Sequence, residues 1–406
     1  MSASVANAPA VSADEVLALL RELRPPLETE RVALANALGR VLREPVCAPE
    51  DQPPFDRSSV DGYAVRREDR ATHFRIVDEI RAGDWKPRAL QPGEAVRIAT
   101  GGALPGDSLQ VVMKEDVRAT GSALTVLRRD QELHIRFRGE EARAGQVLVA
   151  AGTILEPGTL GLLASVGCAE PRVTRQPRVL HIATGNEIVA PGEKPERGQI
   201  RDSNSTLVRA FLGSWGVVPE QVRVGEDKAV IESALRPAAS ALAPDLLLIS
   251  GGASVGEHDF TRRLLEESGF TIRVSKTSAR PGKPLLVAQR GGTLAFGLPG
   301  NPLAHFVCLN LYVRAALETF AGQAAAPLFQ TGVLAADLAA GGNARETFWP
   351  ARWILQDGSA MLTPLPWTSS GDLTALATAN ALIRVSAGAG QFRRGSRVEF
   401  VRTERH

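Results

Sequence analysis

A glycine-rich loop that follows an apolar run carries the most distinctive chemistry in this sequence. Residues 246–259 read LLLISGGASVGEHD, so a segment typical of a buried strand leads into a loop and then into the start of a helix. Glycine lets the backbone approach a ligand closely, and the free N–H groups at a helix start attract anions. A phosphate-binding loop and a tight turn without a ligand both fit such a pattern. The residues predicted to bind substrate here are Ser250, Gly251, Gly252, Ser254 and Gly256.

Three further motifs lie next to predicted strands. ATGNE at 183–187 follows one strand, GLPGNP at 297–302 follows another, and RPGKP at 280–284 brings two cations to a turn before a third. Each dipeptide alone is an ordinary turn signal. In open α/β sheets, however, ligands lie beyond the carboxyl ends of the strands, so we expect the motifs to surround one pocket. The predicted lining residues are Glu187, Lys276, Arg280, Lys283, Pro299, Gly300 and Pro302.

Carboxylates accompany the cations of this predicted pocket. Glu187 and Asp259 lie in the motifs, and Asp227 lies at the start of a predicted helix. Mg²⁺ in proteins is held by one or two carboxylates together with phosphate oxygens. We therefore expect a Mg²⁺ ion held by Glu187 and Asp259. For Asp259 the alternative is a charge that only stabilises a helix start.

A second polar cluster lies in the first third of the chain. PPFDRSSVDGYA at 53–64 contains Asp61, RIATGG at 97–102 contains Thr100, and the segment from Arg136 to Glu141 reads RFRGEE. These are turn-prone, charged segments that do not suit a protein core. From the chemistry of the residues alone, a solvated surface is the favoured interpretation.

The elements that must position these motifs are an α/β domain between two β-rich regions. Strand and helix patterns alternate over 178–320, which predicts a mostly parallel sheet with helices on both faces. Short β-prone runs over 46–145 predict an inserted, mostly β domain, and β-prone segments from about 327 onward predict a last β-rich domain. The fold class predicted is therefore multi-domain α/β plus β.

The N-terminal region predicts two helices. Ser12 and Glu15 have the spacing of a capping box, in which each side chain satisfies a first-turn amide of the helix that follows. Residues 29–43 read TERVALANALGRVLR, and their apolar residues recur at helical spacing. We therefore expect one helix directly after Ser12 and another over 29–43.

Composition excludes several classes of function. The 406 residues have a net charge of +2 and no basic run, which argues against a nucleic-acid partner. Cys47, Cys168 and Cys308 are scattered, which indicates a reducing cytoplasm rather than a disulfide framework. No secretory signal and no run of about 18 apolar residues is present, so we expect no membrane span.

Taken together, the motifs resemble those of the molybdenum insertase family, which comprises molybdopterin molybdenumtransferases and the gephyrin E domain. The resemblance spans the chain and rests on ALGRVL, PPFDRSSVDGYA, RIATGG, RGEE, TGNE, DSN, SGGASVGEHD, PGKP and GLPGNP. It implies an elongated domain from 27–45 and 146–177, and an inserted β domain at 46–145. It further implies a molybdopterin-binding α/β domain from 7–26 and 178–326, and a C-terminal β-barrel-like domain at 327–406.

The resemblance also implies a reaction and a set of site residues. Family members are homodimers that convert adenylylated molybdopterin and molybdate, with a divalent cation, to molybdenum cofactor and AMP. Other proteins of molybdenum cofactor biosynthesis are implied as partners. The pocket of one subunit is completed by the inserted domain of the other. The implied inserted-domain set is Asp61, Thr100, Arg136 and Glu141. The implied α/β set is Glu187, Asp227, Asp259, Lys276, Arg280 and Lys283, with Ser370 from the last domain.

Two positions depart from the family pattern, which usually has Asp at Glu141 and Lys at Arg280. Arginine does not release its proton, but its planar fork clamps anions, so anion binding at Arg280 is retained. Two other functions remain to be compared. A molybdopterin adenylyltransferase would leave Asp61 and Thr100 without a task. A non-catalytic molybdopterin-binding scaffold would not need the acidic and basic pocket set.

Overall fold

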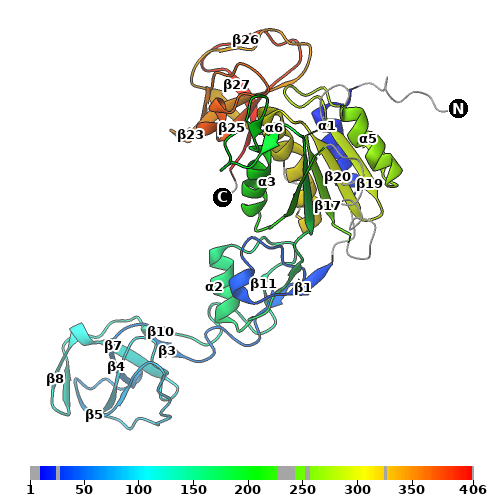
Figure 1. The fold of residues 1–406 in the computed structure, drawn as a ribbon. Helices are drawn as coiled ribbons and strands as arrows, with labels where there is room; N and C mark the ends of the chain where they lie inside the picture. Colours follow the sequence, from blue (N-terminus) through cyan, green and yellow to red (C-terminus); the bar gives the residue numbers. More distant parts are fainter. Residues whose placement is uncertain (1–9, 24–27, 226–242, 252–256, 324–326, 405–406) are drawn as a thin grey trace. The chain divides into compact units, whose positions relative to one another are not determined.

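The computed structural model describes residues 10–23, 28–225, 243–251, 257–323 and 327–404. The chain forms two compact units (Figure 1). The discontinuous unit consists of Met1–Arg43 and Arg172–His406, and the inserted unit consists of Glu44–Pro171. The four-part division expected from the sequence stays a prediction.

A six-stranded sheet forms the centre of the discontinuous unit. Its first four strands are mutually parallel and its last two run antiparallel to their neighbours. In sheet order the strands are β16 (Glu220–Val224), β13 (Val179–Thr184), β17 (Leu246–Ser250), β20 (Thr293–Leu298), β19 (Leu286–Arg290) and β18 (Thr271–Val274). The predicted mostly parallel sheet is confirmed.

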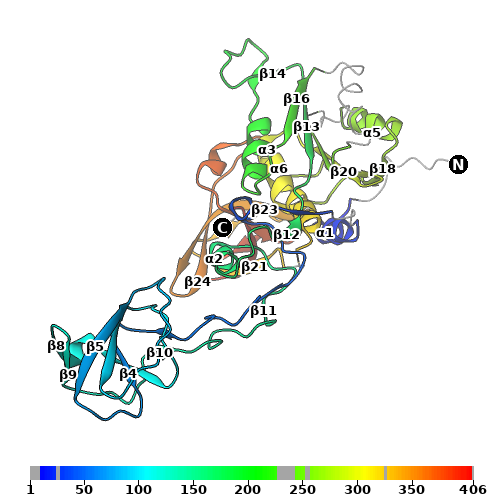
Figure 2. The same cartoon turned by 90° about the horizontal axis from the view of Figure 1, so that it is seen from below.

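Helices cover both faces of this sheet, as predicted. Because strand side chains alternate between faces, Leu246 and Leu248 pack on one side, whereas Leu247 and Ile249 pack on the other. One face carries α1 (Ala13–Glu22), α3 (Asn204–Gly213) and a long helical segment, and the other carries α5 (Glu257–Glu267). Figure 2 shows α3 and α6 beside β13 and β16.

The capping box at the chain start is confirmed, but the second expected N-terminal helix is wrong. Ser12 caps α1 and Glu15 reaches back to it. In place of a helix over 29–43, β1 (Thr29–Arg31) pairs with β12 (Arg172–Thr174), and only a 3-10 turn, η2 (Leu34–Asn36), follows. Pairing with a distant strand satisfies the backbone there, so tertiary context overrides the local helical pattern.

The long helical segment after β20 begins at the turn that carries the GLPGNP motif. It consists of α6 (Pro302–Cys308), a π-helical turn η5 (Leu309–Val313) and α7 (Arg314–Ala321). Pro302 occupies the first helical position, where its missing N–H costs nothing. Asn301 is at the cap position, but its side chain makes no capping bond. It is therefore free to bond elsewhere.

The C-terminal part of the discontinuous unit is a closed five-stranded barrel, which confirms the β-barrel-like prediction. Its strands are β21 (Gln330–Leu334), β24 (Ser359–Pro364), β23 (Thr347–Gln356), β25 (Ala381–Val385) and β27 (Arg397–Arg402). A small pair, β22 (Leu338–Ala339) and β26 (Gln391–Phe392), and a 3-10 turn, η6 (Thr374–Ala377), accompany it. Arg384 of β25 forms an ion pair with Asp14 of α1, at 2.6 Å.

The inserted unit is mostly β, as predicted, around a mixed six-stranded sheet. In order the strands are β7 (Leu109–Met113), β4 (Gly62–Arg66), β6 (Glu94–Ile98), β5 (His73–Ile80), β9 (Ala123–Val126) and β8 (Val117–Thr120), with the 3-10 turn η3 (Lys114–Asp116). The smaller elements are β2 (Val46–Cys47), β11 (Val147–Val149), β3 (Arg57–Ser58), β10 (Ile135–Arg136) and α2 (Pro157–Ser165). Within the described residues, no helix has the length and apolar character needed to cross a membrane.

Candidate active site

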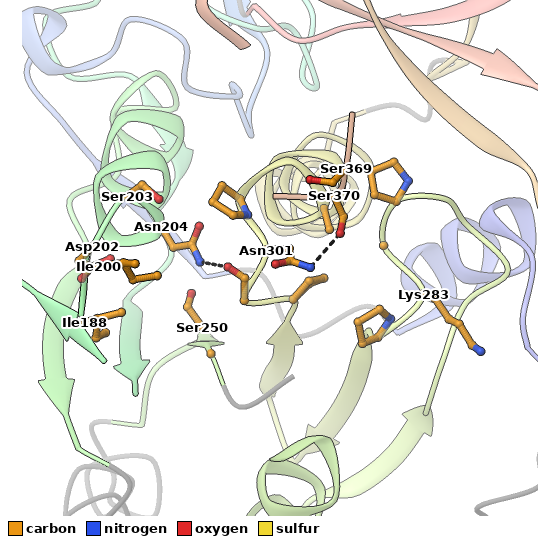
Figure 3. A pocket seen from close by; sticks show the side chains of 18 of the residues that line it. Ile188, Ile200, Asp202, Ser203, Asn204, Ser250, Lys283, Asn301, Ser369 and Ser370 are labelled. Atoms are coloured by element: carbon orange, nitrogen blue, oxygen red, sulfur yellow. Dashed lines mark hydrogen bonds between the residues drawn. The ribbon is translucent and has the colours of Figure 1, made fainter. Parts of the chain in front are cut away.

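A cavity of about 610 Å³ opens at the carboxyl ends of β13, β17 and β20. Its wall includes the start of α3, the turn 280–284, the turn 299–302 and the loop 367–370 of the barrel region. Figure 3 shows side chains from these segments around it. The pair β14 (Ile188–Val189) and β15 (Ile200–Arg201) adds Ile188 and Ile200. The strand-end motifs predicted to share one pocket do so.

The floor of the cavity is formed by Ser250 and Gly251 at the end of β17. Gly251 has φ +98°, and a Cβ there would lie 2.1 Å from the carbonyl oxygen of Thr184. No side chain fits so close to a backbone oxygen, so this position requires glycine. The hydroxyl of Thr184 donates to the carbonyl oxygen of Ser250 at 3.3 Å. The glycine therefore lets the ends of β13 and β17 approach each other closely at the floor of the cavity.

Two asparagine amides hold the turn that follows β20. The Nδ2 of Asn204 donates to the carbonyl oxygen of Gly300 at 2.7 Å. The Nδ2 of Asn301 donates to the hydroxyl oxygen of Ser370 at 2.8 Å (Figure 3). The backbone N–H of Leu303 donates to the carbonyl oxygen of Ser370 at 3.0 Å. The GLPGNP turn is thus tied both to α3 and to the loop from the barrel region.

The loop that carries Ser370 is organised by the carboxylate of Asp372. It accepts from the backbone N–H groups of Thr368 and Thr374, at 3.0 and 2.9 Å, and from the hydroxyls of both. These bonds, led by the Thr374 hydroxyl, lower the pKa of Asp372 to about 2. The loop is therefore braced by an ionised side chain at any ordinary pH.

Arg280 is the cation most firmly placed at the cavity. Its guanidinium carbon lies 5.1 Å from the centre of the Trp367 ring, a cation–π contact. Its backbone N–H donates to the carbonyl oxygen of Glu346, and its carbonyl oxygen accepts from Phe348, both at 2.7 Å. Lys283 also lines the cavity, but Figure 3 shows its side chain extending away from the other labelled residues. Lys276 does not line the cavity.

Glu187 and Asp202 are the carboxylates at the cavity within the described residues. The side chain of Asp202 is already bonded to the N–H and hydroxyl of Ser205, at 2.9 and 2.6 Å. No group of three His, Cys, Asp or Glu side chains suited to a metal occurs in the described part of the chain. A single carboxylate, Glu187, together with ligand phosphates still suits Mg²⁺.

Five predicted residues lie outside what the structure describes. Gly252, Ser254, Gly256 and Asp227 belong to undescribed segments, and Asp259 lies in α5 with its side chain undescribed.

In the inserted unit, Asp61 and Thr100 lie together, as their motifs suggested. The Asp61 carboxylate accepts from the backbone N–H and hydroxyl of Thr100, at 2.8 and 2.9 Å, and from the Nζ of Lys114 at 3.1 Å. These donors, the Thr100 N–H first, lower the pKa of Asp61 from 3.8 to about 2. Asp61 is exposed, so an ionised carboxylate faces solvent.

Arg136 lies on β10, the strand paired with the short strand β3, and Glu141 contacts Arg57 of β3. Arg136 forms an ion pair with Glu140 at 2.8 Å, and Glu141 lies 3.4 Å from the guanidinium of Arg57. Arg136 and Arg57 are register partners in the β3–β10 pair, and Ser58 of β3 accepts from the backbone N–H of Gly101. The four predicted residues of the inserted unit therefore gather around β3. All four side chains are exposed.

The cavity contains most of the predicted substrate-binding residues and several that sequence reasoning missed. Predicted and found at the cavity are Glu187, Ser250, Gly251, Arg280, Lys283, Pro299, Gly300, Pro302 and Ser370. Missed were Asp202, Ser203, Asn204, Asn301, Arg345 and Trp367. The DSN motif was a signal for the first three. Arg345 and Trp367 come from the barrel region and have no local motif. The roles of all these residues stay predictions.

Comparison with known proteins decides the family. Residues 11–167 match the MoeA N-terminal region (domain I and II), 181–319 a probable molybdopterin binding domain, and 331–402 the MoeA C-terminal region (domain IV). A molybdopterin molybdenumtransferase of Bacillus subtilis is 33% identical over 96% of this chain and 93% of its own length. The chain belongs to the molybdopterin molybdenumtransferase family.

Other members of the molybdopterin molybdenumtransferase family agree in extent and fold. One from Staphylococcus aureus is 30% identical over 92% of this chain and 91% of its own length. The crystal structure of a molybdopterin biosynthesis MoeA protein from Pyrococcus horikosii superimposes with a TM-score of 0.80, at 28% identity, over 98% of this chain and all of that one. The resemblance inferred from the motifs is confirmed.

Proposed function

We propose that this chain transfers molybdenum from molybdate to adenylylated molybdopterin and releases AMP. As a member of its family it is a transferase of molybdenum cofactor biosynthesis. The observation that supports the finer reaction is the cavity, which combines backbone turns, the cations Arg280 and Arg345, and the carboxylate of Glu187. Its volume lies within the roughly 300–1,000 Å³ of small-molecule sites.

The charges of the cavity suit two anionic substrates. A pyrophosphate and a molybdate both present oxyanion oxygens, which bind arginine in a planar, bidentate way. Arg280 is held by the Trp367 ring and by two backbone bonds, so it is oriented before any ligand arrives. Preorganised cations of this kind stabilise charge that develops as a phosphoanhydride breaks.

A magnesium ion is the cofactor that we propose for this cavity. We propose that Glu187 and Asp259 hold it together with phosphate oxygens of the substrate. When bound, Mg²⁺ would neutralise phosphate charge and polarise the bond to AMP. The support is the chemistry of the donor set, because carboxylates beside phosphate are the usual ligands of this ion.

The active form is proposed to be a homodimer with shared sites. In this arrangement the inserted unit of one copy brings Asp61, Thr100, Arg136 and Glu141 to the cavity of the other. The support is that all four are exposed and gather around one strand, and that Asp61 is ionised. We place the protein in the cytoplasm, since the three cysteines form no disulfide framework in the part of the chain that the structure describes, as a reducing compartment favours.

Mixed dimers test the shared site. Asp61→Ala and Glu187→Ala homodimers should each release AMP roughly a hundredfold more slowly, because each lacks a charge in both sites. In a mixed dimer one of the two sites is intact, so about half of the activity per dimer should return. AMP release from adenylylated molybdopterin, molybdate and Mg²⁺ is the measurement. Glu50→Ala, at an exposed carboxylate, is the control and should be fully active.

Other outcomes point to the other functions. Mixed dimers without recovered activity would contradict a site shared between subunits. If the wild-type protein converts molybdopterin and ATP but releases no AMP in the transfer assay, it is an adenylyltransferase. If it binds molybdopterin but reacts with neither set of substrates, it is a scaffold.

A further inference from the structure

A buried chain of hydrogen bonds leads to Ser250 on the face of the sheet that packs against α3. Gln221 of β16 and His181 of β13 are cross-strand register partners, and His181 is fully buried. The Nε2 of His181 lies 2.7 Å from the hydroxyl oxygen of Ser250, and its Nδ1 lies 2.9 Å from the Nε2 of Gln221. The chain thus links α3 to the cavity floor.

The orientation of the Gln221 amide is fixed by two partners of unambiguous type. Its Oε1 lies 2.7 Å from the Nε of Arg209, and a guanidinium only donates. Its Nε2 lies 2.9 Å from the carbonyl oxygen of Ser205, which only accepts. The Nε2 of Gln221 therefore also donates to the Nδ1 of His181.

The direction of the last bond follows from the charge of His181. Burial lowers the pKa of His181 to about 3, so the ring is neutral and carries one proton. Because Nδ1 accepts from Gln221, that proton is on Nε2 and is donated to Ser250. The hydroxyl oxygen of Ser250 is then an acceptor for His181, and its own proton is available to another acceptor.

That acceptor is not found among the residues the structure describes, whereas Ser250 lines the cavity. We infer that His181, oriented by Gln221 and Arg209, positions Ser250 as a hydrogen-bond donor to an oxyanion oxygen of the ligand. The inference rests on the proposed function, in which pyrophosphate and molybdate supply such oxygens. His181 is a positioning residue, since it acts through Ser250.

The arrangement favours an oxyanion in two ways. A hydroxyl that accepts one bond is polarised and becomes a stronger donor in the next, and donation to an anionic oxygen is among the stronger hydrogen bonds. Beyond Arg209, the chain of Gln221, His181 and Ser250 carries no net charge. It therefore orients the Ser250 proton without competing with the cations of the cavity for the ligand. A ligand atom that can only donate would leave the Ser250 proton without an acceptor.

The ring proton can be observed directly. In ¹⁵N-histidine-labelled wild-type protein we expect His181 to be neutral with its proton on Nε2. His305 is an internal reference of the opposite kind. It is also buried with its pKa lowered to about 4, and its Nδ1 lies 3.1 Å from the carbonyl oxygen of Pro299, so its proton is on Nδ1. His181→Gln removes one signal and assigns it. A His181 proton on Nδ1 overturns the inference.

Binding measurements test the donor role. We expect Ser250→Ala and His181→Phe each to weaken binding of the same oxyanion, pyrophosphate or molybdate, about tenfold in calorimetric titrations. The oxyanion that is affected identifies which source of oxygen Ser250 contacts. The double variant should bind no more weakly than either single variant, because the two substitutions remove the same interaction with the ligand. His181→Gln keeps an N–H donor and should recover part of the affinity.

The control is a buried hydroxyl of similar type away from the cavity. Thr293 of β20 donates to the carbonyl oxygen of Pro244 and is buried, so Thr293→Val should cost stability and leave binding unchanged. A folded His181→Phe protein that binds both oxyanions as the wild type does, or additive losses in the double variant, would refute the relay. Failure of the wild type to release AMP refutes the proposed function instead and leaves the proton assignment measurable.

Discussion

At the scale of single residues, the predicted site depends on side chains whose charge is fixed by donors around them. Asp61 accepts three hydrogen bonds and Asp372 accepts four, and both carboxyl pKa values fall to about 2. Neither side chain is buried, so hydrogen bonds rather than removal from water set their ionisation. Both carboxylates therefore stay negatively charged at any pH well above 2.

The ionisation of Asp61 gives a pH prediction. Its pKa is lowered on folding, so its contribution to stability is present above 3.8 and is lost as pH falls toward about 2. A ¹³C-carboxyl titration should therefore find Asp61 still ionised at about pH 3. Thr100→Val and Lys114→Met should each raise the midpoint, since each removes one donor. Asp372 lies in the other unit and should not respond. A wild-type midpoint at the ordinary value contradicts the hydrogen-bond pattern.

The motifs predicted those site residues whose types are unusual at their positions in the sequence. They did not predict the other residues of the site. Ser250 lies at the end of one apolar strand and Glu187 lies three residues beyond another, so their positions near strand ends were evident. Trp367 reaches the same cavity from a distant barrel loop, which no local pattern indicates. His181 lies within RVLHIAT, an ordinary core strand by pattern, and its contact with Ser250 depends on sheet register. Only the fold reveals such partners.

At the scale of elements, the apolar run of β17 is the axis of the α/β region. All five of its residues are buried, and its four apolar residues belong alternately to the two cores that flank the sheet. This strand was predictable because length and flanking turn residues distinguish a buried strand from a helix. The segment 29–43 was not, since its pairing partner is β12, far along the chain. Local periodicity carries no information about such pairing.

Truncation of a β17 side chain should weaken the whole discontinuous unit. Leu248 is fully buried in one core, so Leu248→Ala should lower the free energy of unfolding by about 2–5 kcal/mol. Leu355 is 70% exposed on β23, and Leu355→Ala should change it by less than about 0.5 kcal/mol. Urea unfolding followed by circular dichroism measures both. Equal effects of the two substitutions would contradict the assigned core.

At the scale of the whole molecule, the chain is two bodies with separate cores. The inserted unit has its own hydrophobic clusters on the two faces of its sheet, around Val111 and Val112. The discontinuous unit combines the α/β sheet and the barrel, and Phe348 of β23 belongs to the same core as α7. Units with independent cores can unfold independently.

Calorimetry of the full chain should therefore show two transitions. Val111 is fully buried in the inserted unit, so Val111→Ala should lower the midpoint of one transition only. Leu248→Ala should lower the other. A single transition that both substitutions shift together would show that the two units unfold as one body.

The pairing of β1 with β12 has a consequence for the order of events on the ribosome. The guanidinium of Arg172 bonds the hydroxyl of Thr29 across 143 positions of sequence, and Arg384 meets Asp14 across 370. At roughly 5–20 residues per second of synthesis, the first helix and strand emerge on the order of ten seconds or more before their partners exist. The inserted unit is continuous in sequence and has hydrophobic clusters of its own. The discontinuous unit is thus the first to begin translation and the last to be completed. The inserted unit is the part best placed to fold first.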